Sequence, residues 1–189
     1  MLRFRLDPPA QRAENRFDLC LAAVLHDRNG YAPDLDGPTN HGISQEFYTL
    51  WRESSLQSGR EVWRIDFREV EEIYRAGFWE PSHAGDCPAP LDLLVFECAV
   101  ESGPKWAIQT LQQALRLRRD GLFDKRTRER LRCVDPRAVA LDFLQFRQEF
   151  YRDLADRNPD CRELLSHRMD RMEEQRIILL NPAPVEREA

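Results

Sequence analysis

Residues 30–42 read GYAPDLDGPTNHG, and this stretch decides which folds are open to the chain. It is rich in Gly, Pro, Asp and Asn, which favour turns, so we expect a turn-rich loop or a short irregular hairpin. Upstream, apolar residues recur at the spacing i, i+4, i+7 and i+8, which predicts a first helix ending near Gly30. Downstream, Ser44 can cap a second helix. The apolar residues of the first helix are Phe17, Leu21, Val24 and Leu25.

Helical spacing continues through most of the remaining chain, so the predicted fold class is mainly α. Asp66 and Glu69 form a capping-box-like helix start. Residues 81–90 are rich in Pro, Gly and Ser and mark the predicted boundary between two lobes. The expected segments after that boundary are a buried helix over residues 91–100, a corner at Ser102-Gly103-Pro104, a long helix from Asp135-Pro136 and a last helix from Pro159.

The composition limits the classes of protein that remain. The 189 residues are 42% hydrophobic and 32% charged, which suits one compact domain or one domain with two lobes. The net charge of −5 disfavours nucleic acid as a partner. The longest apolar runs, residues 19–25 and 93–96, are far shorter than the roughly 20 residues that cross a bilayer, so we expect no membrane insertion. Residues 1–11 have no apolar signal core, and we expect synthesis in the cytoplasm without a signal peptide.

Cysteine and histidine spacing gives no metal or cofactor motif. The five cysteines have no CxxC spacing, and an odd, dispersed set predicts free thiols. The four histidines have no ligand spacing either, so we expect no metal and no cofactor. The cysteines are Cys20, Cys87, Cys98, Cys133 and Cys161.

Candidate chemistry concentrates at the end of the first helix and in the loop after it. Muramidases use an acid at a helix end to protonate the glycosidic oxygen, while a loop carboxylate and hydroxyl handle the oxocarbenium charge and the water. The loop here offers Asp34, Asp36, Thr39 and Asn40. Asp and Asn are also ordinary turn formers, which is the alternative interpretation of the same residues.

Residues 34–44 read DLDGPTNHGIS and resemble a signature block of family 108 glycoside hydrolases, the lysozyme-like N-acetylmuramidases. In that family the block runs aspartate-proline-glycine-glycine-x-threonine-asparagine-x-glycine-isoleucine. Ile73-Tyr74-Arg75 and Phe78-Trp79 resemble a further element of the family. The resemblance implies a lysozyme-like helical fold with a short irregular or hairpin loop after the first helix. It also implies peptidoglycan glycan strands as the partner.

The second half resembles the predicted peptidoglycan-binding domain that usually follows in these proteins, although that domain's glycine-tryptophan pair is absent. We therefore expect a lysozyme-like lobe over residues 1–80, a helical peptidoglycan-binding-like lobe over 81–180 packed with it as one globule, and a flexible tail over 181–189. The matching residues are Val95-Phe96, Ala99-Val100, Ser102-Gly103-Pro104, Ala107-Ile108, Leu111-Gln112, Leu115, Asp120-Gly121, Thr127, Phe146-Arg147, Tyr151 and residues 168–171.

The family's first signature block, histidine-glutamate-glycine-glycine-tyrosine, is broken in this chain. Counting without gaps, the resemblance places the catalytic glutamate on Arg28 and its neighbouring histidine on Asp27. The first glycine falls on Asn29, and only Gly30 and Tyr31 remain. Arginine stays charged and cannot donate a proton at neutral pH, and losing general acid–base help costs on the order of 10²–10⁴-fold in rate. A guanidinium would also repel a developing oxocarbenium ion.

Other residues can take over part of the site. Asp27 is one residue from Arg28, a rotation of about 100° on a helix, and can replace the acid if the helix end is irregular. Asp34, at the family's loop aspartate, can position a water, or it can form an ion pair with Arg28. Thr39 and Asn40 can bind a sugar or shape the turn. These are the catalytic candidates Asp27, Arg28, Asp34 and Thr39, with Asn40 and Tyr31 as substrate-binding candidates.

Aromatic residues supply the remaining substrate-binding candidates, Tyr74 and Trp79. With Phe78 they can stack on sugar faces along a groove, or they can belong to the core. We expect Trp79, at a loop boundary, to be partly exposed, and we expect Trp51, Trp63 and Trp106 to pack inside. The basic run over residues 116–132 is interpreted as a solvated face or as a patch for an anionic polymer or a protein partner.

Three functions remain open from the sequence. The first is a lysozyme-like, peptidoglycan-recognising protein with weak or no hydrolysis. The second is an active muramidase, an endolysin or effector, that cleaves the MurNAc-GlcNAc bond with Asp27 or another acid. The third is a non-catalytic interaction module of a phage, secretion or envelope assembly, with Arg28 filling the old cleft. Routes to the periplasm or cell wall that remain open are a holin, a specialised secretion system and assembly into a particle.

Overall fold

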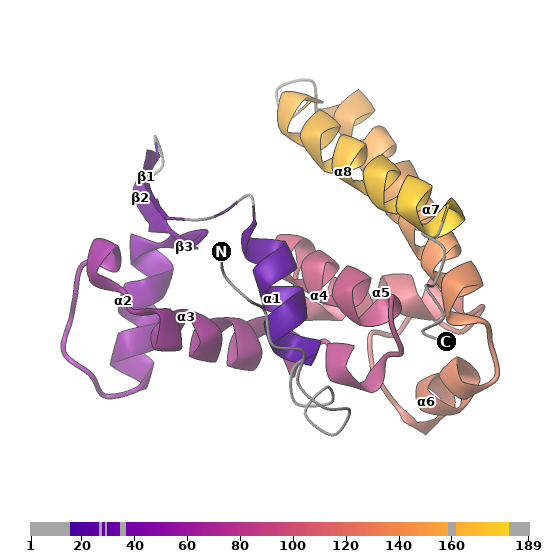
Figure 1. Cartoon of the computed structure of the whole chain (residues 1–189), viewed down its shortest axis with the longest axis horizontal. Coiled ribbons are helices and arrows are strands. Elements are labelled where there is room, and N and C mark those ends of the chain that lie inside the picture. Colours follow the sequence, from indigo (N-terminus) through magenta and orange to yellow (C-terminus); the bar gives the residue numbers. More distant parts are fainter. Residues whose placement is uncertain (1–15, 27, 29, 35–36, 159–161, 182–189) are drawn as a thin grey trace, which may run out of the picture.

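The computed structural model describes residues 16–26, 28, 30–34, 37–158 and 162–181. Figure 1 shows a smaller group of elements, the sheet with α2 and α3, and a larger group, α5 to α8. Helices α1 (Arg16–Leu25) and α4 (Leu91–Ser102) lie between the two groups (Figure 1). The regular secondary structure of the described part is helical apart from three short strands, so the predicted mainly α class is confirmed.

Helix α1 buries one face, formed by Phe17, Cys20, Leu21, Val24 and Leu25. The helix ends at Leu25, so the prediction that it reaches Gly30 is wrong. Beyond Leu25 the sequence is polar up to Gly30, and no further apolar residue continues the buried face. The chain leaves the helix through a turn in which the Arg28 amide donates to the Leu25 carbonyl at 3.0 Å.

The GYAPDLDGPTNHG stretch forms a three-stranded antiparallel sheet with its downstream residues, which confirms the hairpin alternative. Its strands are β1 (Tyr31–Asp34), β2 (Gly37–Asn40) and β3 (Ile43–Ser44), in that order across the sheet. Tyr31 lies opposite Asn40, and Thr39 lies opposite Ser44. Gly37 has φ +110°, a conformation that glycine adopts without the steric cost of a Cβ.

The smaller group is closed by α2 (Gln45–Ser54) and α3 (Phe67–Tyr74), with the turn η1 (Val62–Arg64) between them. Both predicted caps are confirmed: the Ser44 hydroxyl accepts from the Phe47 amide, and Asp66 with Glu69 forms a capping box. The Glu69 carboxylate also accepts from Arg52 at 2.5 Å and pairs with Arg60. These buried pairs fix α2 against α3.

Helix α4 is the centre of the larger core. It is buried nearly all round and packs against α1, α5 and α7, which confirms the predicted buried helix. It follows the π-helical turn η2 (Arg75–Trp79) and the short η3 (Ala84–Asp86). It ends at the predicted corner, where Gly103 has φ +89° and α5 (Pro104–Ala114) begins.

The C-terminal helices complete the molecule. The predicted long helix is α7 (Pro136–Arg157), and it packs against α8 (Arg162–Leu180) as a pair on one side of α1 and α4 (Figure 1). The predicted start of the last helix at Pro159 lies outside the described residues. Helix α6 (Lys125–Arg132) was not predicted as a separate element; its Asp124 N-cap, which accepts from the Thr127 amide, was the available signal.

No helix within the described ranges is both long and apolar enough to span a membrane. Cys20, Cys87 and Cys98 are buried free thiols and Cys133 is an exposed one, while Cys161 lies outside the described residues. The division at residues 80 and 81 stays a prediction, and the expected tail beyond residue 181 is likewise outside the described part.

Candidate functional site

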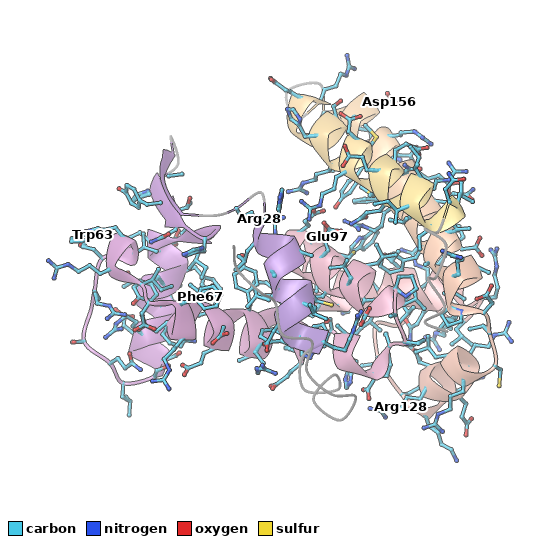
Figure 2. All side chains as sticks on the ribbon, in the orientation of Figure 1. Arg28, Trp63, Phe67, Glu97, Arg128 and Asp156 are labelled. Carbon is cyan, nitrogen blue, oxygen red and sulfur yellow. The ribbon has the colours of Figure 1, made fainter. Side chains whose placement is uncertain are left out.

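Arg28 lies just beyond the C-terminal end of α1, in the turn that leads to β1. Figure 2 shows it at the upper end of α1, with Glu97 on the neighbouring α4 and the α7–α8 pair above. Its side chain is 29% exposed. Asp27 lies outside the described residues, as does the side chain of Asp34, whose backbone ends β1. The predicted Arg28–Asp34 ion pair therefore stays a prediction.

The guanidinium of Arg28 is directed toward the helical body. Its Nη2 lies 3.5 Å from Oε1 of Glu101, near the end of α4. Its Nη1 is shielded from solvent and has no hydrogen-bond acceptor within the described part of the chain. On the other side, a Cβ at Gly42 would lie 3.1 Å from Cδ of Arg28 and 3.2 Å from Oη of Tyr74. Arg28 thus packs between the β2–β3 turn and α4.

Glu101 is the inner partner of Arg28, and both of its oxygens are engaged. Oε2 accepts from Nη2 of Arg147 at 2.8 Å and from the Tyr151 hydroxyl at 3.2 Å, both on α7. Oε1 faces Arg28, and the side chain is only 4% exposed. Ser102 lies 3.1 Å from the same Tyr151 hydroxyl. Neither carboxylate oxygen is therefore placed as a free proton donor to a substrate.

Glu97, one turn earlier on α4, ties the same cluster to α8. Its carboxylate pairs with the guanidinium of Arg171 and accepts from Nε2 of Gln175 at 2.6 Å. Arg147, 2% exposed, lies 3.9 Å from Oε2 of Glu97. Burial lowers the pKa of Arg147, but its acidic neighbours raise it by more, so this guanidinium stays charged. Arg171 also donates to the Ala23 carbonyl at 3.1 Å, which connects α8 to α1.

An open pocket of about 760 Å³ lies beside this cluster, and we call it the α8 pocket. The pocket extends from Arg28 to α8. It is therefore lined by residues from three parts of the chain: the segment after α1, helix α4 and helix α8. Its lining residues are Arg28, Glu101, His167, Arg168, Asp170, Arg171 and Glu174.

The strand candidates differ in how accessible they are. Tyr31 is 52% exposed on β1, and Thr39 is half-buried on β2. Asn40 is 7% exposed, and its Nδ2 donates to the Val62 carbonyl at 3.2 Å. Its Oδ1 is shielded and has no partner among the described residues. Asn40 therefore fixes β2 against η1, while Tyr31 and Thr39 keep atoms available to a ligand.

Tyr74 belongs to the core at 2% exposure, so stacking of its ring on a sugar face is excluded in this conformation. Its hydroxyl donates to the His41 carbonyl at 2.8 Å, which holds the β2–β3 turn. Burial raises the pKa of Tyr74, and the nearby Arg28 guanidinium opposes that rise. Burial also lowers the pKa of His41, whose amide donates to the Gly30 carbonyl. These contacts make Tyr74 a residue that positions the turn.

The predictions for the tryptophans need two corrections. Trp79 is 8% exposed and meets Phe17 and Phe96 edge to face, so the expected partial exposure is wrong. The reason is that η2 continues α3 and turns Trp79 inward onto α1 and α4. Trp63, expected inside, is 54% exposed beneath the Arg64 guanidinium. Packing of Trp51 and Trp106 against the core is confirmed.

Sequence reasoning missed the buried charges around Arg28. Glu97 and Glu101 occupy inward positions of the most apolar helix, and Arg147 lies between Phe143 and Phe150 along α7. A charged residue at a core-facing position needs a partner of opposite sign, and this was the signal available. Within the described residues, no three His, Cys, Asp or Glu side chains are grouped to hold a metal ion.

Two comparisons with known proteins found similarity to this chain. Residues 25–103 match the model of the family described as Glycosyl hydrolase 108. The structure of Brucella abortus SagA is similar over 91% of this chain and 99% of that one, with a TM-score of 0.72 and 22% sequence identity. At that identity the likeness shows a similar fold alone. No curated protein matches the chain.

Proposed function

We propose that this chain recognises peptidoglycan glycan strands without efficient hydrolysis, because residues 25–103 match the model of the family described as Glycosyl hydrolase 108. The proposal separates two properties that an active muramidase combines. Binding needs an exposed polar and aromatic surface beside a groove, whereas cleavage of the glycosidic bond needs a proton donor at one defined place.

The observation that carries the proposal is the environment of Arg28. The family resemblance expects the catalytic acid at this position, and a guanidinium lies there instead. It is held 3.5 Å from Glu101 and packed against the turn at Gly42. Arginine cannot act as a general acid at neutral pH, and its charge opposes the oxocarbenium-like transition state. An arginine at this position therefore allows a glycan to bind but does not promote its cleavage.

The neighbouring carboxylates do not replace the missing acid. Glu101 is 4% exposed with both oxygens engaged, and Glu97 is 2% exposed and paired with Arg171. Glycosidases need an acid that reaches the glycosidic oxygen. Asp27 remains the acid of the alternative proposal, an active muramidase. For binding, Tyr31 and Thr39 offer an exposed ring and a hydroxyl on adjacent strands.

Purified peptidoglycan sacculi test both parts of the proposal. We expect the protein to co-sediment with sacculi while turbidity stays constant and no soluble muropeptides are released. Release of muropeptides that disappears in Asp27→Ala would overturn the proposal in favour of an active muramidase. Failure to co-sediment would instead favour the interaction module, in which Arg28 only fills the old site.

A further inference from the structure

The α8 pocket is lined by charges of both signs. Arg28, Arg168 and Arg171 contribute guanidiniums, while Asp170 and Glu174 contribute exposed carboxylates. The four on α8, Arg168, Asp170, Arg171 and Glu174, recur at three- and four-residue spacing, which places them on one face of the helix. A pocket of this kind suits a ligand that itself carries both carboxylate and ammonium groups.

Two of the guanidiniums are oriented before any ligand arrives. Arg171 is fixed on its inner side by the Glu97 carboxylate and the Ala23 carbonyl. Arg168 lies over the ring of Tyr151, with 5.7 Å between its guanidinium carbon and the ring centre. An oriented guanidinium loses little side-chain entropy on binding. It can bind a carboxylate through two parallel hydrogen bonds.

We propose that the α8 pocket binds the peptide part of peptidoglycan, a short peptide with free carboxylates, while the glycan strand passes Arg28. This inference rests on the proposed function and adds the substrate class: peptide-bearing strands rather than bare glycan. Arg28 belongs both to the pocket and to the position where the family's acid is expected, so a peptide in the pocket would be attached to a sugar close by.

The character of the pocket favours a peptide over a sugar. Sugar rings are uncharged and usually stack on aromatic faces, whereas no Phe, Tyr or Trp is among the described residues that line this pocket. The charged side chains that line the pocket would gain little from a neutral ligand and would lose hydration. The volume of about 760 Å³ is within the range of small-ligand sites and is large enough for a few amino-acid residues.

Fluorescence anisotropy with two labelled probes tests the inference. The probes are soluble glycan strands with intact peptides and the same strands after an amidase has removed the peptides. We expect the protein to bind the intact strand about 10-fold more tightly. We expect Arg168→Ala to remove most of that difference. Added salt should weaken the intact-strand complex more than the complex with the stripped strand, which keeps only the lactyl carboxylates that the amidase exposes.

Arg118→Ala is the matched control, because Arg118 is an exposed arginine outside the α8 pocket. Equal binding of both probes would overturn this inference and leave the proposed function intact. An equal loss in Arg118→Ala and Arg168→Ala would also overturn it, since affinity would then follow net charge. Absence of binding to either probe would instead contradict the proposed function. Circular dichroism of each variant confirms that the fold is retained.

Discussion

At the scale of single residues, Arg28 changes the chemistry of the site more than its neighbours do. A glutamate at a helix end can be protonated or charged, whereas arginine has one charge state in proteins. The guanidinium also joins a cluster with Glu101 and Arg147, so the position has become part of the packing. Arg28 therefore accounts both for the expected loss of hydrolytic activity and for the contact between the sheet and α4.

Arg28→Glu tests whether the remaining site can still support hydrolysis. The introduced carboxyl would lie beside Glu101, and like charge together with partial burial raises a carboxyl pKa toward that of a useful general acid. We expect muropeptide release on the order of 100-fold above the parent protein, measured by chromatography of digested sacculi.

Arg28→Gln separates the effect of removing the positive charge from the effect of adding a proton donor. It removes the guanidinium and supplies no proton donor, so we expect no release above the blank. Equal gains in both variants would show that the arginine only repelled the substrate. No gain in a folded Arg28→Glu protein would mean that the missing histidine and glycine of the family block are also required.

The tryptophans show what residue patterns leave undetermined. Trp79 and Trp63 both lie near predicted element ends, yet one is 8% and the other 54% exposed. Their exposure depends on tertiary neighbours: α1 and α4 pack on Trp79, whereas Trp63 contacts the guanidinium of Arg64, its neighbour in sequence. Tertiary contacts of this kind leave no periodic signal in the local sequence.

At the scale of elements, local chemistry predicted most boundaries. Ser44, Asp66 and Asp135 each cap the helix that was expected after them, because the capping hydrogen bonds lie within three residues. Helix α6 was missed because its sequence is nearly all charged, and only Thr127 and Leu131 are buried. The end of α1 was misplaced because residues 26–29, which follow its last turn, are all polar and do not continue the buried face.

The turn between β2 and β3 is the element on which the site depends most closely. His41 and Gly42 have φ of 51° and 74°, and the turn packs on Arg28 and Tyr74. We expect Gly42→Ala to lower the free energy of unfolding by about 1–3 kcal/mol, because a Cβ adds backbone strain and meets Cδ of Arg28 at 3.1 Å. Urea denaturation measures the change.

Gly59→Ala is the appropriate comparison for that variant. A Cβ at Gly59 meets no atom within 4 Å and its φ is not in the left-handed region, so we expect a change within about 0.5 kcal/mol. Identical urea midpoints for the two variants would contradict the packing of this turn on Arg28.

At the scale of the whole molecule, the buried charges connect elements that are far apart in sequence. Arg28 follows α1, Glu97 and Glu101 lie on α4, and Arg147 and Arg171 lie on α7 and α8. Such a network gains little net free energy relative to apolar packing, but breaking it leaves uncompensated charge. The wall of the α8 pocket is therefore held in place by the same contacts that join the helices.

Arg147→Met measures how strongly this network joins the helices. Removing the guanidinium, which is 2% exposed, leaves Glu101 without its closest cationic partner and takes one of two cations away from Glu97, and we expect a loss of about 3–5 kcal/mol in urea denaturation. Arg116→Met breaks an exposed pair with Asp142 and should cost less than about 1 kcal/mol. Adding Glu101→Gln to Arg147→Met should recover part of the loss, because the unpaired buried charge is then removed. Strictly additive losses in the double variant would mean that Arg147 stabilises the core by its volume and that the helices are not joined by charge.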